Sequence, residues 1–247
     1  MTGSRFLELF LSRRSRLSDA RRRALASVPV RRVVHEDGDL IVERGRPPSY
    51  SCLLIRGMTM RRHAVVRGGH VISAISVPGD FIDLHAFVLD ELDHDIVSVG
   101  RTVVEHVQHA DLRAICAEDP GLMEMLWHET LVEAKAHRAW IVAGASLRAP
   151  QRIAHLMCEV EARLAGVGLA EGGHFTVPFD QRTLARVLGY SPVHVNRAVQ
   201  DLRAAGLLTW SGRSVALPDK PEIRRYAAFD PGYLELDGRP SPLGSTA

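Results

Sequence analysis

The sequence predicts an α+β protein in which an N-terminal antiparallel β domain is followed by one long helix and then by a C-terminal domain of short helices. Three observations predict this architecture. Residues 30–109 alternate short β-rich runs with Gly and Pro turns, residues 122–143 contain neither Gly nor Pro, and residues 180–217 contain two short amphipathic segments and a hairpin pattern. We place the domains at residues 15–118 (β domain), 119–146 (long helix), 147–220 (C-terminal domain) and 221–247 (tail).

The composition is that of an ordinary folded protein. The 247 residues are 46% hydrophobic and 24% charged, which excludes disordered, collagenous and low-complexity chains. Apolar runs fall short of the roughly 18 residues that a membrane span needs, and the arginine-rich N-terminus does not look like a signal peptide. The three cysteines form neither a zinc-type spacing nor a disulfide framework. We therefore expect a cytoplasmic protein.

The net charge of +2 conceals a strong asymmetry. Residues 1–34 contain nine arginines and two acids, residues 80–119 contain ten acids and two arginines, and residues 180–225 contain eight Lys or Arg and four acids. A basic C-terminal block suits a polyanionic partner, although charge alone favours a solvated helical surface.

The β domain is expected to begin after a short helix over residues 16–28, with Ser18 as its N-cap. The expected strands cover residues 30–34, 40–43, 52–55, 58–63, 70–76, 96–99 and 103–108. Turn signals that include Arg56-Gly57 recur every 8–13 residues between them, which is typical of an antiparallel barrel or sandwich.

The long helix is expected to start at Asp119, which can cap it, with Pro120 in its first position. It carries two apolar stripes: Met123, Trp127, Leu131, Ala134, Ile141 and Ala145 form one, and Leu122, Leu126, Ala136, Trp140 and Ala143 form the other. A helix with two apolar faces must be covered on both sides. One face can contact the β domain, and we expect the other to contact a second chain. The alternative is a central helix buried within a single chain.

The C-terminal domain contains a helix-turn-helix pattern. After a helix over residues 150–165 and a short strand over 175–179, Leu184, Ala185 and Leu188 form the apolar face of a first short helix. Gly189 supplies a stop, and Ser191 and Pro192 start a second helix with Val195, Ala198, Val199 and Leu202 as its apolar face. The following residues predict a hairpin, or wing, that turns at Ser211-Gly212.

The outward residues of the second helix suit contacts with base edges of double-stranded DNA. They are Val193, His194, Asn196, Arg197 and Gln200. Arginine pairs with guanine, Asn or Gln with adenine, and an apolar side chain packs on the thymine methyl. Four further residues suit phosphate contacts: Gln181, Arg182, Ser191 and Arg213. The sequence therefore predicts a DNA-binding protein and not an enzyme.

From about residue 15 to residue 218 the chain resembles the Crp/Fnr family of bacterial transcription regulators. The resemblance is carried by Glu43-Arg44-Gly45, Ile55-Arg56-Gly57, Pro78-Gly79-Asp80-Phe81-Ile82, Asp119-Pro120, Arg152-Ile153-Ala154 and residues 189–197. It implies a β-roll (double-stranded β-helix) like a cyclic-nucleotide-binding domain, a dimerisation helix and a winged helix-turn-helix. It also implies a homodimer on a near-palindromic operator, with RNA polymerase and a small-molecule effector as further partners.

The sequence departs from the family at two places. Arg197 matches the base-reading arginine, but the usual Arg and Glu near the start of that helix are Pro192 and Val193, so a different operator is expected. Cyclic AMP-binding members have a Gly-Glu-Leu turn and an Arg-Ser-Ala run, and here these are Asp83-Leu84-His85 and His94-Asp95-Ile96. Carboxylates beside a phosphate would repel it. We therefore expect a degenerate effector pocket formed by Asp83, Leu84, His85, His94 and Asp95 that does not bind cyclic AMP in the usual way.

Residues 83–95 contain four Asp, one Glu and two His. One interpretation is a metal site with nitrogen from His85 and His94 and oxygen from Asp83, Asp93 or Asp95. The other is a polar surface segment, which we prefer because HxH and HxxxH ligand pairs are missing. We expect no metal and no cofactor. A sensor of small ligands or metals that works through protein contacts is the alternative function, and a metal-dependent hydrolase would leave the C-terminal helix pair unexplained.

Overall fold

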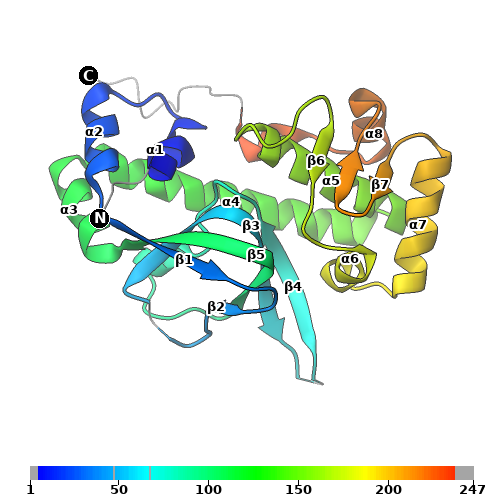
Figure 1. The fold of residues 1–247 in the computed structure, drawn as a ribbon, viewed down its shortest axis with the longest axis horizontal. Coiled ribbons are helices and arrows are strands. Elements are labelled where there is room, and N and C mark those ends of the chain that lie inside the picture. The colour runs from blue at the N-terminus through cyan, green and yellow to red at the C-terminus, as the bar shows by residue number, and fades with distance from the viewer. Residues whose placement is uncertain (1–4, 47, 67, 237–247) are drawn as a thin grey trace.

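The computed structural model describes residues 5–46, 48–66 and 68–236. Figure 1 shows helix α4 running along the molecule, with the β domain and helices α1 to α3 towards one end and α5 to α8 towards the other. The predicted fold class is confirmed: an antiparallel β domain, one long helix and a C-terminal helix-turn-helix region.

The β domain is one antiparallel sheet. Its strands are β1 (Val30–His35), β2 (Leu40–Val42), β3 (Tyr50–Ala64), β4 (His70–Ser76) and β5 (Asp95–Gln108). The strand order is β1-β5-β3-β4, and β2 pairs with a further stretch of β5. The long strands β3 and β5 pair along most of their length and form the centre of the domain.

The expected turn at Arg56-Gly57 is wrong. The runs at 52–55 and 58–63 belong to the single strand β3, and the runs at 96–99 and 103–108 belong to the single strand β5. The register between the two strands shifts between Leu54 and Arg56 and again between Arg56 and Met58. Gly57 has φ +84°, and a Cβ there would lie 2.6 Å from the Thr102 hydroxyl. The glycine therefore marks a β-bulge, which bends a strand without ending it.

Helices cover this sheet. They are α1 (Arg5–Ser12), α2 (Asp19–Ser27), the 3-10 turn η1 (Leu84–Phe87) and α3 (His109–Glu118). Ser18 caps α2 as predicted, because its hydroxyl accepts a hydrogen bond from the Arg21 backbone N–H. Helix α1 lies before the predicted start of the domain, yet its Leu7, Phe10 and Leu11 are buried in the core. The structure therefore extends the β domain towards the N-terminus.

Helix α4 (Pro120–Ser146) is about 40 Å long at 1.5 Å per residue. The Asp119 side chain caps it by accepting from the Gly121 N–H at 3.0 Å. One predicted stripe packs inward, with Leu122, Leu126 and Ala143 buried. The other stripe stays exposed in the single chain.

The C-terminal domain comprises α5 (Ala149–Ala165), β6 (His174–Thr176), α6 (Gln181–Leu188), α7 (Pro192–Ala204), β7 (Thr209–Ser211), β8 (Ser214–Ala216), α8 (Lys220–Tyr226) and the 3-10 turn η2 (Pro231–Leu234). The strand predicted over 175–179 ends at Thr176, since Pro178 has no N–H to extend a strand. The spacing of Tyr226, Phe229 and Tyr233 predicts that the tail folds back onto the protein, and Phe229 is indeed buried. Residues 238–247, expected to be disordered, lie outside the described residues.

The two domains share one hydrophobic core. Met60, Ile75 and Val97 of the sheet belong to the same buried cluster as Ile153 of α5 and Leu184 of α6. The contact holds the C-terminal domain against strand β4 and gives it a defined position relative to the long helix. Among the described residues, none of the helices is both long and apolar enough to span a membrane.

Candidate nucleic-acid interface and effector region

Helices α6 and α7 are held at their ends by three caps, of which the sequence predicts Gly189 and Ser191. The Asp180 side chain caps α6 by accepting from the Thr183 N–H at 2.9 Å. Gly189 ends α6 in the left-handed conformation (φ +70°), which favours glycine. The Ser191 hydroxyl caps α7 by accepting from the His194 N–H at 3.3 Å. These caps fix the tight turn between the two helices.

Helix α7 presents a polar, exposed face. Val195, Ala198, Val199 and Leu202 are buried, whereas Val193, His194, Asn196, Arg197 and Gln200 are exposed. Val193 is 72% exposed, which is unusual for a large apolar side chain and leaves its methyl groups free for an external partner. The predicted base-contacting residues thus share one face of one helix.

The residues predicted to contact phosphate surround this face. Gln181 and Arg182 start α6, Ser191 caps α7, and Arg213 lies in the turn between β7 and β8. Asn196 Nδ2 donates to Gln181 Oε1 at 3.1 Å, so the two predicted DNA contacts already touch each other. Arg213 also lines a cleft of about 800 Å³ between the C-terminal domain and the β domain.

The exposed stripe of α4 gives a second candidate surface. Met123, Trp127, Leu131 and Ile141 are 38%, 63%, 48% and 71% exposed, and they recur at helical spacing along one side of the helix. A contiguous apolar surface of this kind on a single chain indicates a protein contact.

The residues of the expected effector pocket are occupied by contacts within the chain. Asp83 is fully buried, and its Oδ1 accepts from the Cys52 N–H at 2.6 Å. Leu84 packs in the core, and His94 pairs with Asp93 at 2.6 Å. Asp95 accepts from the Arg44 N–H and forms an ion pair with Arg62 at 2.9 Å.

Arg61 lies among these residues and was not singled out by the sequence. It is buried in β3, donates to the Ile82 carbonyl at 3.1 Å, and forms an ion pair with Glu133 of α4. Its other nitrogen lies 3.1 Å from His137 Nε2. The available signal was a consecutive pair of arginines, Arg61-Arg62, in an apolar strand, since a buried arginine requires a partner.

Burial and the Arg61 charge shift the pKa values of the neighbouring groups. Burial raises the pKa of Asp83 to about 7, against the hydrogen bond from Cys52 and the Arg61 charge, which lower it. Burial, helped by the Arg61 charge, lowers the pKa of His94 to about 4 and also lowers that of His85. At neutral pH both histidines are therefore neutral.

The metal interpretation of residues 83–95 receives no support. Within residues 5–46, 48–66 and 68–236, no three or more His, Cys, Asp or Glu side chains gather in a way that could hold a metal ion. His94 lies near two other imidazoles, with ring centroids 5.3 Å from His85 and 5.4 Å from His63.

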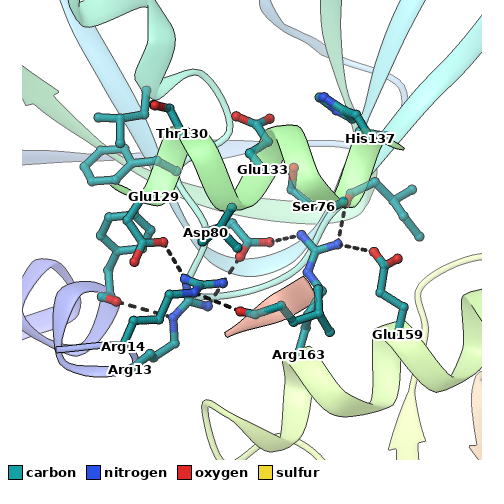
Figure 2. Close-up of a pocket in the computed structure, with 18 of the residues that line it drawn as sticks. Arg13, Arg14, Ser76, Asp80, Glu129, Thr130, Glu133, His137, Glu159 and Arg163 are labelled. Atoms are coloured by element: carbon teal, nitrogen blue, oxygen red, sulfur yellow. Dashed lines mark hydrogen bonds and ion pairs between the residues drawn. The ribbon is translucent and has the colours of Figure 1, made fainter. Parts of the chain in front are cut away.

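A small cavity of about 70 Å³ lies where the β domain, α1, α4, α5 and the tail meet. Figure 2 shows its charged lining, in which Arg13, Arg14 and Arg163 face Asp80, Glu129 and Glu159. The Arg13 Nη1 and Asp80 Oδ1 atoms are 3.3 Å apart, and Arg14 pairs with Glu129. The charges of this lining are therefore neutralised within the chain.

Comparisons with known proteins agree with this geometry. Residues 151–226 match the family model of the Crp-like helix-turn-helix domain. A search of curated proteins found no match. Among solved structures, FixK2 from Bradyrhizobium japonicum has a TM-score of 0.72 at 21% identity, covering 81% of this chain and 98% of that one. TTHB099 from Thermus thermophilus, described as a transcriptional regulator of the CRP family, has a TM-score of 0.59 at 18% identity, covering 79% and 96%. The c-di-GMP-responsive regulator CLP from Xanthomonas campestris has a TM-score of 0.59 at 14% identity, covering 87% and 98%.

The family match identifies residues 151–226 as a helix-turn-helix domain of the Crp-like kind, and most of the chain has the fold of solved transcription regulators. The resemblance to the Crp/Fnr family is confirmed, by sequence over residues 151–226 and by fold over most of the chain.

Proposed function

We propose that this protein is a homodimeric regulator that binds a near-palindromic operator through α7. Val193, His194, Asn196 and Arg197 would contact base edges in the major groove. Gln181, Arg182, Ser191 and Arg213 would contact the phosphates on either side. Binding to chromosomal DNA would take place in the cytoplasm.

The observation that carries this proposal is the division of α7 into two faces. Its apolar residues are buried against α5 and α6, and the residues suited to base contacts are exposed beside a capped helix start. The positive end of the helix dipole and the free N–H groups at that start favour a nearby phosphate.

Selection of duplexes from a random-sequence pool tests the proposal directly. We expect the recovered sequences to contain two inverted half-sites, and we expect their affinity to fall steeply as salt rises, because counterions are released. Recovery of unrelated sequences bound with equal affinity would contradict sequence-specific binding through α7.

The homodimer is proposed to form through the exposed stripe of α4, because Trp127 and Leu131 remain 63% and 48% exposed within the described chain. Leu131→Glu should convert the dimer to a monomer in sedimentation experiments. Leu169, which is 51% exposed in the loop between α5 and β6, supplies the matched control. Leu169→Glu should leave the dimer intact, and a dimer that survives Leu131→Glu would exclude this surface.

We also propose that the effector region does not bind cyclic AMP. The support is that Asp83, Leu84 and Asp95 are already engaged within the chain and that Arg61 is paired with Glu133. Calorimetry with cyclic AMP should show no binding heat at micromolar concentrations. Saturable binding in that range would overturn this part of the proposal.

A further inference from the structure

Residues 227–236 follow the matched Crp-like domain and fold back between α4 and α5. We call this segment the strap. Ala227, Phe229 and Leu234 are buried, with exposures of 0%, 6% and 2%. The Phe229 ring meets His155 of α5 edge-on at 5.2 Å, and His155 Nδ1 lies 3.3 Å from the Ala227 carbonyl oxygen. The strap is therefore an integral part of the packed structure.

The strap shares one buried carboxylate with both helices. Glu159 of α5 has a side chain that is 1% exposed. Its Oε2 accepts a hydrogen bond from the Tyr233 hydroxyl at 2.7 Å and another from Trp140 Nε1 at 2.9 Å. Trp140 belongs to α4, so one oxygen atom joins the strap, the long helix and the DNA-binding domain.

The same carboxylate connects to the β domain. Glu159 Oε1 accepts from Arg163 Nη1 at 2.9 Å, and Arg163 Nη2 pairs with Asp80 Oδ2 at 2.6 Å. Figure 2 shows Arg163 between these two carboxylates. Opposing burial, the two carboxylates raise the pKa of Arg163, which keeps the link charged. Buried networks of this kind are rigid when every member has a partner.

The strap is also attached to α4 and to the segment that follows α1, through residues beyond Tyr233. Glu235 pairs with Lys135 and lies 2.7 Å from His128 Nε2, and both partners belong to α4. Arg14 Nε donates to the Leu234 carbonyl at 3.0 Å. These contacts hold the strap against the helix that we propose as the dimer interface.

We propose that the strap fixes the angle between α4 and α5 and so sets the spacing of the two recognition helices in the dimer, with Tyr233 as a positioning residue. This inference rests on the proposed function. Because α4 belongs to the dimer axis and α5 begins the DNA-binding domain, the angle between them decides where each α7 lies. Half-sites one helical turn apart require the two helices about 34 Å apart. A dimer with this spacing fixed in advance loses less conformational freedom on binding.

Tyr233→Phe tests the inference, since it removes only the hydroxyl that Glu159 accepts from. Two duplexes recovered by selection should be compared, one with both half-sites and one with a single half-site. We expect the variant to bind the two-site duplex about tenfold more weakly and the single-site duplex as well as the wild type does. Tyr226→Phe, in the same tail but away from Glu159, is the matched control and should change neither affinity.

Equal weakening on both duplexes would overturn the inference, because it would assign Tyr233 to the stability of the DNA-binding domain. Unchanged affinity for the two-site duplex would overturn it too. Glu235→Gln gives an independent variant at the other attachment of the strap. Its affinity should also fall for the two-site duplex and stay unchanged for the single-site duplex.

Hydrogen exchange separates this inference from the proposed function. Backbone amides of residues 147–152, at the junction of α4 and α5, should exchange faster in Tyr233→Phe without any DNA present. If the wild-type protein binds no duplex, the proposed function fails, and faster exchange would still support the strap. If these amides exchange at the wild-type rate in Tyr233→Phe, the proposed role of the strap is excluded.

Discussion

The two candidate sites of this protein differ in what their side chains contact. On α7 the polar residues point outward, and Arg197 and Gln200 are exposed. In the effector region of the β domain, Asp83, His94 and Arg61 are buried and bonded to neighbouring groups of the same chain. An exposed polar face is available to a partner, whereas a buried polar cluster stabilises the fold. Similar residue types are therefore exposed in one region and bonded within the fold in the other.

The largest expected effect concerns Asp83 and its pH dependence. Its pKa is raised to about 7 in the folded protein, against 3.8 for an ordinary aspartate carboxyl, so the folded state holds the proton more tightly than the unfolded state does. The free energy of unfolding should therefore fall as the pH rises from about 4 to about 7.

Asp83→Asn keeps an oxygen acceptor for the Cys52 N–H and removes the titration. Relative to the wild type, this variant should gain about 4 kcal/mol between pH 4 and pH 8, because each tenfold change in an acid constant is worth about 1.4 kcal/mol. Urea unfolding at both pH values measures it. A constant difference between the two proteins would show that Asp83 is ionised throughout and would weaken the contrast between the two sites.

Arg61→Ala should destabilise the protein by about 3 kcal/mol, because it leaves Glu133 and His137 without their buried partner. Urea unfolding at pH 7 measures the loss. A change below about 0.5 kcal/mol, as is usual for a surface substitution, would place Arg61 with the binding residues instead.

Arg197→Ala makes the matching change on α7. In contrast to Arg61→Ala, we expect it to weaken DNA binding and to leave the stability of the fold unchanged. The free energy of unfolding should stay within about 0.5 kcal/mol of the wild type, since the side chain is exposed. Affinity for the selected duplex should fall about 30-fold, which corresponds to a lost base contact of about 2 kcal/mol. Arg23→Ala, at an exposed position of α2, is the control and should bind normally. Full affinity in Arg197→Ala would remove that residue from the interface.

The smallest effect is expected at Ser191, which caps α7 and lies beside the face that we propose to contact bases. Ser191→Ala should cost about 1 kcal/mol of stability through the lost cap on α7. Ser191→Asp, which keeps a capping oxygen, should restore stability yet weaken DNA binding, because its charge repels phosphate. If Ser191→Asp binds DNA normally, Ser191 lies away from the backbone.

Local patterns were sufficient for most elements. Ser18, Asp119 and Ser191 predicted helix starts, and the structure places all three as caps. The two stripes of α4 predicted two apolar faces, and only the structure shows that the face with Leu122, Leu126 and Ala143 is the one buried in the chain. Local patterns failed at Gly57, where a glycine in a bulge and a glycine in a turn share the same positive φ. Only pairing with the distant strand β5 distinguishes the two.

The sequence by itself determined the fold class, the helix pair and the exposed residues of α7, because caps, periodicity and turn residues act over a few positions. The tertiary structure alone decided that Arg61 fills the effector region and that Tyr233, Trp140 and Glu159 meet at one carboxylate. These contacts join residues 19 to 74 positions apart in the chain. Their geometry depends on how whole elements pack, so the spacing of residues along the chain does not predict it.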